Sequence, residues 1–309
     1  MLGVVGTNHK IAPLSIREQI CAAFAALPLS GVFLSTCNRV EYYFHSKNPA
    51  KTQQEIIRLL RTQGDEGLTS YLYTFFGQEC VHHLERVVCG LDSLFCAETE
   101  IQGQVKRAYE TVRNATLPKA LHILFQKALH TGKIIRRCFQ PPKEEITDHI
   151  RETVSAYLSK GSSDDVLLIG ASAINLKIAH KLKEDAISMT IANRTKERAR
   201  AAASQIGAKT LPWDCIQSAH CHFPCVISAT RSPEYVIDRN QTFSNPQLFI
   251  DLGVPRNIDP YIESSLTKVV NIDSFVPTSS SFSMSQIERV LFRRSKKDFF
   301  TLSNKCQTR

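Results

Sequence analysis

The sequence predicts an α/β protein: an N-terminal α+β catalytic domain, then a Rossmann-like doubly wound parallel sheet, then a partial long connecting helix. The first observation is length, because 309 residues exceed the needs of one ordinary core and suggest two domains. The second is a change in texture after the turn formers of residues 161–165, where short apolar runs alternate with helical segments. The third is composition, since 43% hydrophobic and 22% charged residues are typical of a globular chain.

Composition also narrows the classes of function. No apolar run is long enough to span a bilayer, and the N-terminus lacks a signal-peptide layout, so we expect a cytoplasmic protein without membrane contact. The ten cysteines are scattered without a paired framework, which favours free thiols. A net charge of +9 permits a polyanionic partner such as RNA.

The expected elements follow in order. Short β-favouring runs predict strands, and amphipathic or proline-bounded segments predict helices. In the first half, strands are expected at 2–5, 32–34 and 40–44, and helices at 15–26, 50–62, 104–114 and 120–138. A linking helix is expected at about 143–158. In the second half, strands are expected at 166–169, 188–192, 225–228 and 248–251, and helices at 173–182, 195–206 and about 284–301.

These elements predict four regions: a catalytic domain at 1–142, a linker at 143–160, a nucleotide-binding domain at 161–277 and a hinge with a last helix at 278–309. The last helix is basic at 293–297, and its expected packing residues are Ile287, Val290, Leu291 and Phe299. We expect this basic helix to be free to lie against RNA phosphates.

Ser35-Thr36-Cys37-Asn38-Arg39 is the most informative stretch for chemistry. Cys37 lies where the chain turns between two expected strands, and the guanidinium of Arg39 is two residues away. A thiol must become a thiolate to act as a nucleophile, and a nearby cation favours that form. A small buried thiol without chemistry is the alternative for any single cysteine.

Residues 166–175 have the strand, turn and helix layout of a dinucleotide site, although Ser172 and Asn175 replace two of the usual three glycines. Arg194 follows the second strand, where it suits a 2′-phosphate, so NADPH is the predicted cofactor. A Rossmann-like fold that binds nucleotide poorly is the alternative. The predicted cofactor contacts are Gly170, Ala171, Ser172, Ala173, Ile174, Asn175, Asn193, Arg194, Thr195, Ser228 and Thr230.

Together these segments resemble the glutamyl-tRNA reductase family from Gly3 to about Pro277. The resemblance rests on the segments 6–9, 34–39, 90–93, 103–106, 124–128, 192–195 and 251–256. It implies reduction of glutamyl-tRNA to glutamate-1-semialdehyde by NADPH through a cysteine thioester, the first step of five-carbon tetrapyrrole biosynthesis. A glutamate-1-semialdehyde aminomutase is then a candidate partner.

The resemblance also implies roles for individual residues. Cys37 would be the nucleophile, His83 the acid–base group, and Arg39 the clamp for the glutamate carboxylate. Because His82 precedes it, His83 could equally belong to a helix-surface pair. The implied substrate contacts are Thr36, Asn38, Arg39, Ser93, Glu98, Glu100 and Gln104.

Some segments depart from the family pattern, and two other functions stay open. Residues 97–100 read Ala-Glu-Thr-Glu where the family usually has Gly-Glu-x-Gln, and the chain stops within the long helix, which puts a homodimer in doubt. The alternatives are a non-catalytic tRNA-binding or regulatory relative and a small-molecule oxidoreductase resembling shikimate dehydrogenase. His220, Cys221, His222 and Cys225 lack a second ligand pair, so no metal is expected.

Overall fold

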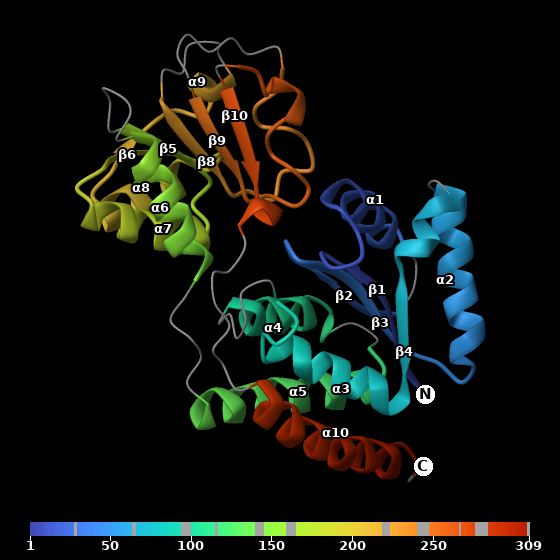
Figure 1. Ribbon diagram of the computed structural model, residues 1–309. Coiled ribbons are helices and arrows are strands. Elements are labelled where there is room, and N and C mark those ends of the chain that lie inside the picture. Colours follow the sequence, from blue (N-terminus) through green and yellow to red (C-terminus); the bar gives the residue numbers. More distant parts are fainter. Residues whose placement is uncertain are drawn as a thin grey trace. The chain divides into compact units, whose positions relative to one another are not determined.

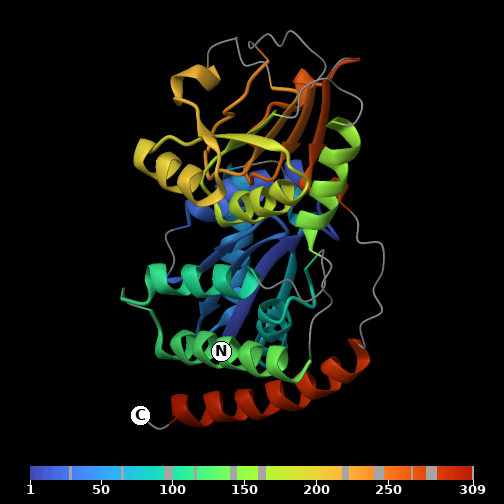
Figure 2. The ribbon, with the colours of Figure 1, turned by 90° about the vertical axis from the view of Figure 1, so that its left-hand side faces the viewer.

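The computed structural model describes residues 1–27, 30–63, 66–93, 100–114, 117–139, 145–158, 165–217, 223–239, 247–265, 267–275 and 284–307. The chain divides into two compact units (Figures 1 and 2). The first unit combines Met1–Lys143 with Pro277–Arg309, and the second is Glu144–Val276. The second unit is therefore inserted into the sequence of the first.

The first unit is built on a four-stranded antiparallel sheet. Its strands are β1 (Leu2–Asn8), β2 (Gly31–Ser35), β3 (Arg39–His45) and β4 (Tyr73–Phe76), in the order β2-β3-β1-β4. Both faces of β1 and β3 are buried because helices cover the sheet on each side. One face packs on α1 (Leu14–Ala25), α2 (Pro49–Gln63) and the 3-10 turn Glu66–Tyr71.

The other face of this sheet packs on α3 (Gly77–Val88), α4 (Glu100–Val112) and α5 (Lys119–Cys138). Apolar side chains recur along each helix at the spacing of one face, and this stripe meets the sheet. The core between them contains Val4, Val32, Leu34, Tyr43, Leu84, Val105 and Phe125.

The last helix, α10 (Met284–Gln307), lies along α3 and α5 and belongs to the first unit (Figure 1). Ile287, Leu291 and Leu302 are buried against that unit. The helix is therefore docked and not free, because this apolar stripe gains more by burial than by exposure, whereas contact of its exposed basic residues with RNA phosphates stays a prediction. Val290, expected to pack, is 39% exposed.

The second unit is a six-stranded parallel sheet in the order β10-β9-β8-β5-β6-β7. Its strands are β5 (Asp165–Ile169), β6 (Ser188–Ala192), β7 (Lys209–Thr210), β8 (Cys225–Ser228), β9 (Gln247–Asp251) and β10 (Thr267–Asn271). Its helices are α6 (Ile146–Leu158), α7 (Ala173–Glu184), α8 (Lys196–Ile206) and α9 (Asp214–Gln217), with 3-10 turns at Pro260–Ile262 and Ile272–Ser274. The strand order reverses between β5 and β8, which is where such sheets bind ligands.

The predicted fold class is confirmed, and most predicted elements occur within a few residues of their expected bounds. The sequence prediction missed α3, β4, β7, α9 and β10. No turn residues separate β4 from α3, since Gly77 itself begins the helix at a φ of 55°. Within the described residues, no helix is long and apolar enough to cross a membrane.

Candidate functional site

Cys37 lies in the tight turn that joins β2 to β3. The Oγ1 atom of Thr36 accepts hydrogen bonds from the backbone N–H groups of Asn38 and Arg39, both at 3.2 Å. The N–H of Thr36 donates to the carbonyl of Arg39 at 2.9 Å. Thr36 and Asn38 are buried, whereas Cys37 is partly exposed and forms no disulfide. The turn therefore presents the Cys37 side chain from a fixed backbone.

Two residues outside the turn hold it in place. Arg17 of α1 is fully buried, and its Nη2 donates to the carbonyl of Cys37 at 3.2 Å while its Nη1 donates to that of Ala12 at 3.0 Å. The N–H of His9 donates to the carbonyl of Asn38 at 2.9 Å. The role of Arg17 was missed, because its partner lies twenty residues further along the chain.

Arg39 begins a buried network of charges. Its guanidinium is fully buried, with Nη1 donating to Oε1 of Glu41 at 2.9 Å and Nη2 to the carbonyl of Asp92 at 2.7 Å. Two of its nitrogens thus bind the protein itself. The predicted clamp on the substrate carboxylate stays a prediction, while the contacts of this structure make Arg39 a partner of Glu41.

Glu41 is the centre of this network. Besides Arg39, three groups bond to its carboxylate: Tyr43 through its hydroxyl at 2.6 Å, Tyr73 through its hydroxyl at 2.5 Å, and Nε2 of His83 at 2.8 Å. Burial acts to raise the pKa of Glu41, but the charges of His83 and Arg39 and these hydrogen bonds hold it well below its usual range. Since an ionised carboxylate only accepts, Nε2 of His83 carries a proton.

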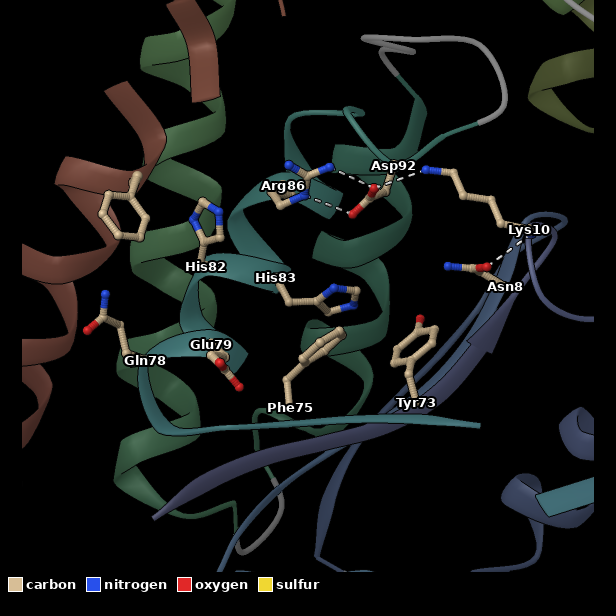
Figure 3. A pocket seen from close by; sticks show the side chains of 11 residues that line it. Asn8, Lys10, Tyr73, Phe75, Gln78, Glu79, His82, His83, Arg86 and Asp92 are labelled. Carbon is tan, nitrogen blue, oxygen red and sulfur yellow. Dashed lines mark hydrogen bonds and ion pairs between the residues drawn. The ribbon is translucent and has the colours of Figure 1, made fainter. Parts of the chain in front are cut away.

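His83 lies on α3 and is buried, so the surface-pair interpretation is wrong for this residue. Its ring packs on Phe75, with centroids 4.8 Å apart, and on Tyr73 at 5.2 Å. It also faces a cavity of about 420 Å³ within the first unit (Figure 3). The residues lining this cavity are Asn8, Lys10, Tyr73, Phe75, Gln78, Glu79, His82, His83, Arg86, Asp92 and Phe292.

The cavity adjoins the Cys37 turn, although Cys37 does not line it. Asn8, at the end of β1, pairs across the sheet with Arg39, the residue that follows the turn. Asp92 connects the cavity to this network, because its carbonyl accepts from Arg39. Its carboxylate accepts from Arg86 at 2.9 and 3.2 Å. Arg86 also forms an ion pair with Glu288 of α10, so the last helix is connected to the site.

The other predicted substrate contacts are more dispersed. Ser93 is buried, and its N–H donates to the carbonyl of Gly90 at 3.3 Å. Glu100 and Gln104 are half-buried near the start of α4 and do not line the cavity. Glu98 lies outside the described residues, as do His220, Cys221 and His222.

In the second unit, the turn after β5 has the geometry of a dinucleotide loop. Gly170 adopts a φ of 97°, and an added Cβ would lie 2.7 Å from the carbonyl oxygen of Ala229. Ser172 caps α7 by accepting from the N–H of Asn175 at 3.3 Å. Asn175, which replaces the third glycine, fits at this position because its buried amide donates to the carbonyls of Ile169 and Gly170 at 2.9 and 2.8 Å.

The residues after β6 complete this turn. Oδ1 of Asn193 accepts from the N–H of Ala171 at 3.1 Å, and its Nδ2 donates to the carbonyl of Thr195 at 3.0 Å. Arg194 is exposed, with its guanidinium carbon 5.8 Å from the centre of the Trp213 ring. The predicted residues 170, 171, 193 and 195 are thus brought together around one turn.

Ser228 and Thr230 meet at a residue that the sequence analysis missed. The Oδ1 atom of Asn257 accepts from Ser228 Oγ at 3.1 Å, from Thr230 N at 2.8 Å and from Thr230 Oγ1 at 3.0 Å. Asp251 holds Asn257 in turn by accepting its N–H at 2.9 Å. Asn257 lies one residue beyond the last segment on which the resemblance rests, and no local pattern marked it.

Comparison with known proteins finds a matching family for each of the two units. Residues 5–138 match the family described as Glutamyl-tRNAGlu reductase, N-terminal domain, and residues 152–276 match Shikimate / quinate 5-dehydrogenase. A glutamyl-tRNA reductase from Syntrophobacter fumaroxidans is 35% identical over 286 residues. Over most of its length the chain is therefore similar to a glutamyl-tRNA reductase. The match covers 84% of this chain and 62% of that relative, so the chain spans less than two thirds of the relative's length.

Two solved structures also resemble this chain. The glutamyl-tRNA reductase from Methanopyrus kandleri is 26% identical, with 99% of this chain and 80% of that chain covered and a TM-score of 0.47. The nucleotide-binding domain of the Thermoplasma volcanium enzyme is 21% identical, with 52% and 97% covered and a TM-score of 0.34. With TM-scores below 0.5, neither adds to what the sequence matches show.

Proposed function

We propose that this protein reduces glutamyl-tRNA to glutamate-1-semialdehyde with NADPH, through a thioester on Cys37, as the first step of five-carbon tetrapyrrole biosynthesis. The observation that supports this most directly is the fixed Cys37 turn, linked through Arg39 and Glu41 to His83. This arrangement lies within the matched glutamyl-tRNA reductase N-terminal domain.

In the first step, the Cys37 thiolate attacks the ester carbonyl of glutamyl-tRNA. The new C–S bond forms as the C–O bond to the tRNA ribose breaks, and the leaving oxygen takes a proton. We assign that proton to Nδ1 of the charged form of His83, because Nε2 is held by Glu41. The ionised Glu41 carboxylate stabilises the imidazolium and fixes its orientation.

In the second step, a hydride adds to the thioester carbonyl carbon, the C–S bond breaks, and the aldehyde leaves with Cys37 restored as a thiolate. NADPH supplies this hydride when bound. The second unit fits a dinucleotide, because a side chain at Gly170 would collide with Ala229 and the first N–H groups of α7, at Ala173 and Ile174, suit a pyrophosphate. Arg194 is exposed after the second strand of this unit, and it would hold the 2′-phosphate.

The decisive experiment compares Cys37→Ser with Cys138→Ser, a control at an exposed cysteine. With glutamyl-tRNA and NADPH, we expect Cys37→Ser to lower turnover by roughly a thousandfold or more while leaving tRNA binding intact. The control should resemble the wild type in NADPH oxidation followed by absorbance. Turnover of Cys37→Ser within a few-fold of wild type would contradict the nucleophile assignment. Tight tRNA binding without any NADPH oxidation by the wild type would favour the non-catalytic alternative.

Arg194 provides the test of cofactor choice. Arg194→Ala should raise the KM for NADPH by about tenfold and leave that for NADH nearly unchanged, since only NADPH carries the 2′-phosphate. Arg198→Ala, an exposed arginine one turn into α8, is the matched control. Equal use of both cofactors by the wild type would refute a role for Arg194 in selection.

A cytoplasmic location, an aminomutase partner and a weak or absent homodimer stay predictions. Light scattering tests the last of these. We expect a monomer or a weak dimer at micromolar concentration, with a mass that falls to about 34.7 kDa on dilution. A mass of twice that value that persists on dilution would contradict it.

A further inference from the structure

We propose that the cavity beside His83 binds the 3′-terminal nucleoside of the substrate tRNA, with Phe292 of α10 as one of its stacking faces. This inference rests on the proposed function and adds to it a subsite and a role for the last helix. The cavity is formed by β1, β4, α3 and α10, all of the first unit (Figure 3).

The position of the cavity follows the chemistry of the ester. In an aminoacyl-tRNA the ester oxygen belongs to the ribose of the terminal nucleoside, so this nucleoside must lie beside both the nucleophile and the proton donor. His83 lines the cavity, and Asn8 lines it opposite Arg39, the residue that follows the Cys37 turn. A volume of about 420 Å³ lies within the range of small-molecule sites.

Aromatic rings form much of the cavity wall. Tyr73, Phe75 and His83 follow one another, with centroids 5.3 Å apart for the first pair and 4.8 Å for the second. On the α10 side, Phe292 meets His82 edge to face at 5.8 Å. Bases of single-stranded RNA bind by stacking on such rings, and each ring face contributes strongly to affinity.

Polar groups in the cavity suit the edge of a nucleoside. Oδ1 of Asn8 accepts from the N–H of Lys10 at 3.0 Å, which leaves the amide nitrogen pointing into the cavity as a donor (Figure 3). The cations Lys10 and Arg86 both pair with the carboxylate of Asp92, at 3.3 and 2.9 Å. Glu79 also lines the cavity, so the two cations are matched by two carboxylates and the interior is close to neutral, which favours a base and a ribose over a free anion.

Cations surround Phe292 on the outer side of α10. Lys296 lies one turn after it, with Nζ 4.6 Å from the centre of its ring, and Arg289 lies one turn before it. Both are exposed, and among the described residues neither forms an ion pair with an acidic side chain. The two acidic residues of α10, Glu288 and Asp298, instead pair with cations of α3 and α5. The outer face of α10 thus suits the phosphates that precede the terminal nucleoside.

The test uses a CCA trinucleotide with a fluorescent 5′ label, because this is the terminal sequence of tRNA. Its binding to the full chain is followed by anisotropy with saturating NADP⁺, which fills any dinucleotide site. We expect Phe292→Ala to weaken binding about tenfold and Phe292→Trp to restore it. Phe300→Ala is the matched control: it lies on the same helix, is 67% exposed and does not line the cavity, so binding should stay within twofold.

The possible results separate this inference from the proposed function. Unchanged trinucleotide binding by Phe292→Ala, or equal weakening by Phe300→Ala, would overturn the cavity assignment whether or not glutamyl-tRNA is reduced. Trinucleotide binding that depends on Phe292 in a protein unable to oxidise NADPH would support the cavity and overturn the proposed reaction. Phe292 is 48% exposed, so the thermal unfolding of Phe292→Ala should match the wild type and exclude misfolding as the cause.

Discussion

Two fully buried glutamates of the first unit, Glu41 and Glu85, take opposite protonation states. Glu41 is bonded to Arg39, His83 and two tyrosine hydroxyls, which together hold its pKa well below the usual range. Glu85 lies at the interface with α10. Burial first, and the neighbouring carboxylate of Asp298 second, raise its pKa to about 8.

The surroundings of Glu85 explain the difference. From α5, Thr131 donates to its Oε1 at 3.3 Å, whereas Lys127 binds Asp298 at 2.5 Å. From α10, Arg294 donates to Thr131 at 3.3 Å and opposes the rise in pKa only weakly. Burial alone therefore does not set the charge of a carboxyl group in this protein. The number and charge of the groups aimed at it do.

The largest expected effect comes from neutralising Glu41. Glu41→Gln keeps the shape of the side chain but leaves the fully buried guanidinium of Arg39 without its counter-charge. We expect a loss of about 3–5 kcal/mol in the free energy of unfolding, measured by urea denaturation at pH 7. A loss below about 1 kcal/mol would mean that the Arg39 charge is compensated elsewhere.

The same substitution at Glu85 should increase the free energy of unfolding at neutral pH, whereas Glu41→Gln lowers it. A pKa raised from 4.5 to about 8 on folding means that the folded state binds the extra proton. The stability from this group is complete below about pH 4.5 and falls by about 1.4 kcal/mol per pH unit until about pH 8. Glu85→Gln removes that slope, so its stability relative to the wild type should increase by about 3 kcal/mol between pH 5 and pH 7.5.

A second group, His9, also makes the stability depend on pH, because burial and Arg39 lower its pKa to about 4. Its contribution rises with pH between about 4 and 6.5, in the opposite direction, and is present in both proteins. The difference between wild type and Glu85→Gln therefore isolates Glu85. Parallel stability curves for the two proteins from pH 5 to 8 would refute the raised pKa.

The smallest effect should come from removing one donor to Glu41. Tyr43→Phe deletes the hydroxyl that donates at 2.6 Å but leaves Arg39, Tyr73 and His83 in place. We expect a loss of about 1.5 kcal/mol in the free energy of unfolding. A loss as large as that of Glu41→Gln would show that the hydroxyl, and not the Arg39 charge, dominates the network.

Local patterns predicted the placement of Cys37 but not the network behind it. The turn could be predicted because polar residues follow a short apolar strand. Arg39, Glu41 and Tyr43 alternate along β3 and so share one side of the sheet, which is a readable signal. Their partners could not be inferred from local sequence. His83 lies 42 residues from Glu41, and Asp92 lies 53 residues from Arg39, on elements whose packing depends on the whole unit.

The last helix shows the same limit. Its extent was readable from its apolar spacing, but its basic residues dominate the local sequence and suggested a free surface. Its acidic residues, Glu288 and Asp298, make the inward contacts, and nothing local indicates that their partners Arg86 and Lys127 lie on two earlier helices. Asn257 was missed for a similar reason, because its role comes from Ser228 and Thr230 on a neighbouring segment.

The second unit is inserted into the sequence of the first, and this sets the order in which the two units can complete their folding during synthesis. The ribosome releases the whole second unit before α10, and N-terminal regions generally fold first. Until α10 emerges, Cys89, Leu91 and Ile135 lack Ile287 and Leu291, which cover them in the finished protein. The unfinished chain therefore leaves these apolar residues uncovered, and Phe292 reaches the cavity only as the last helix docks.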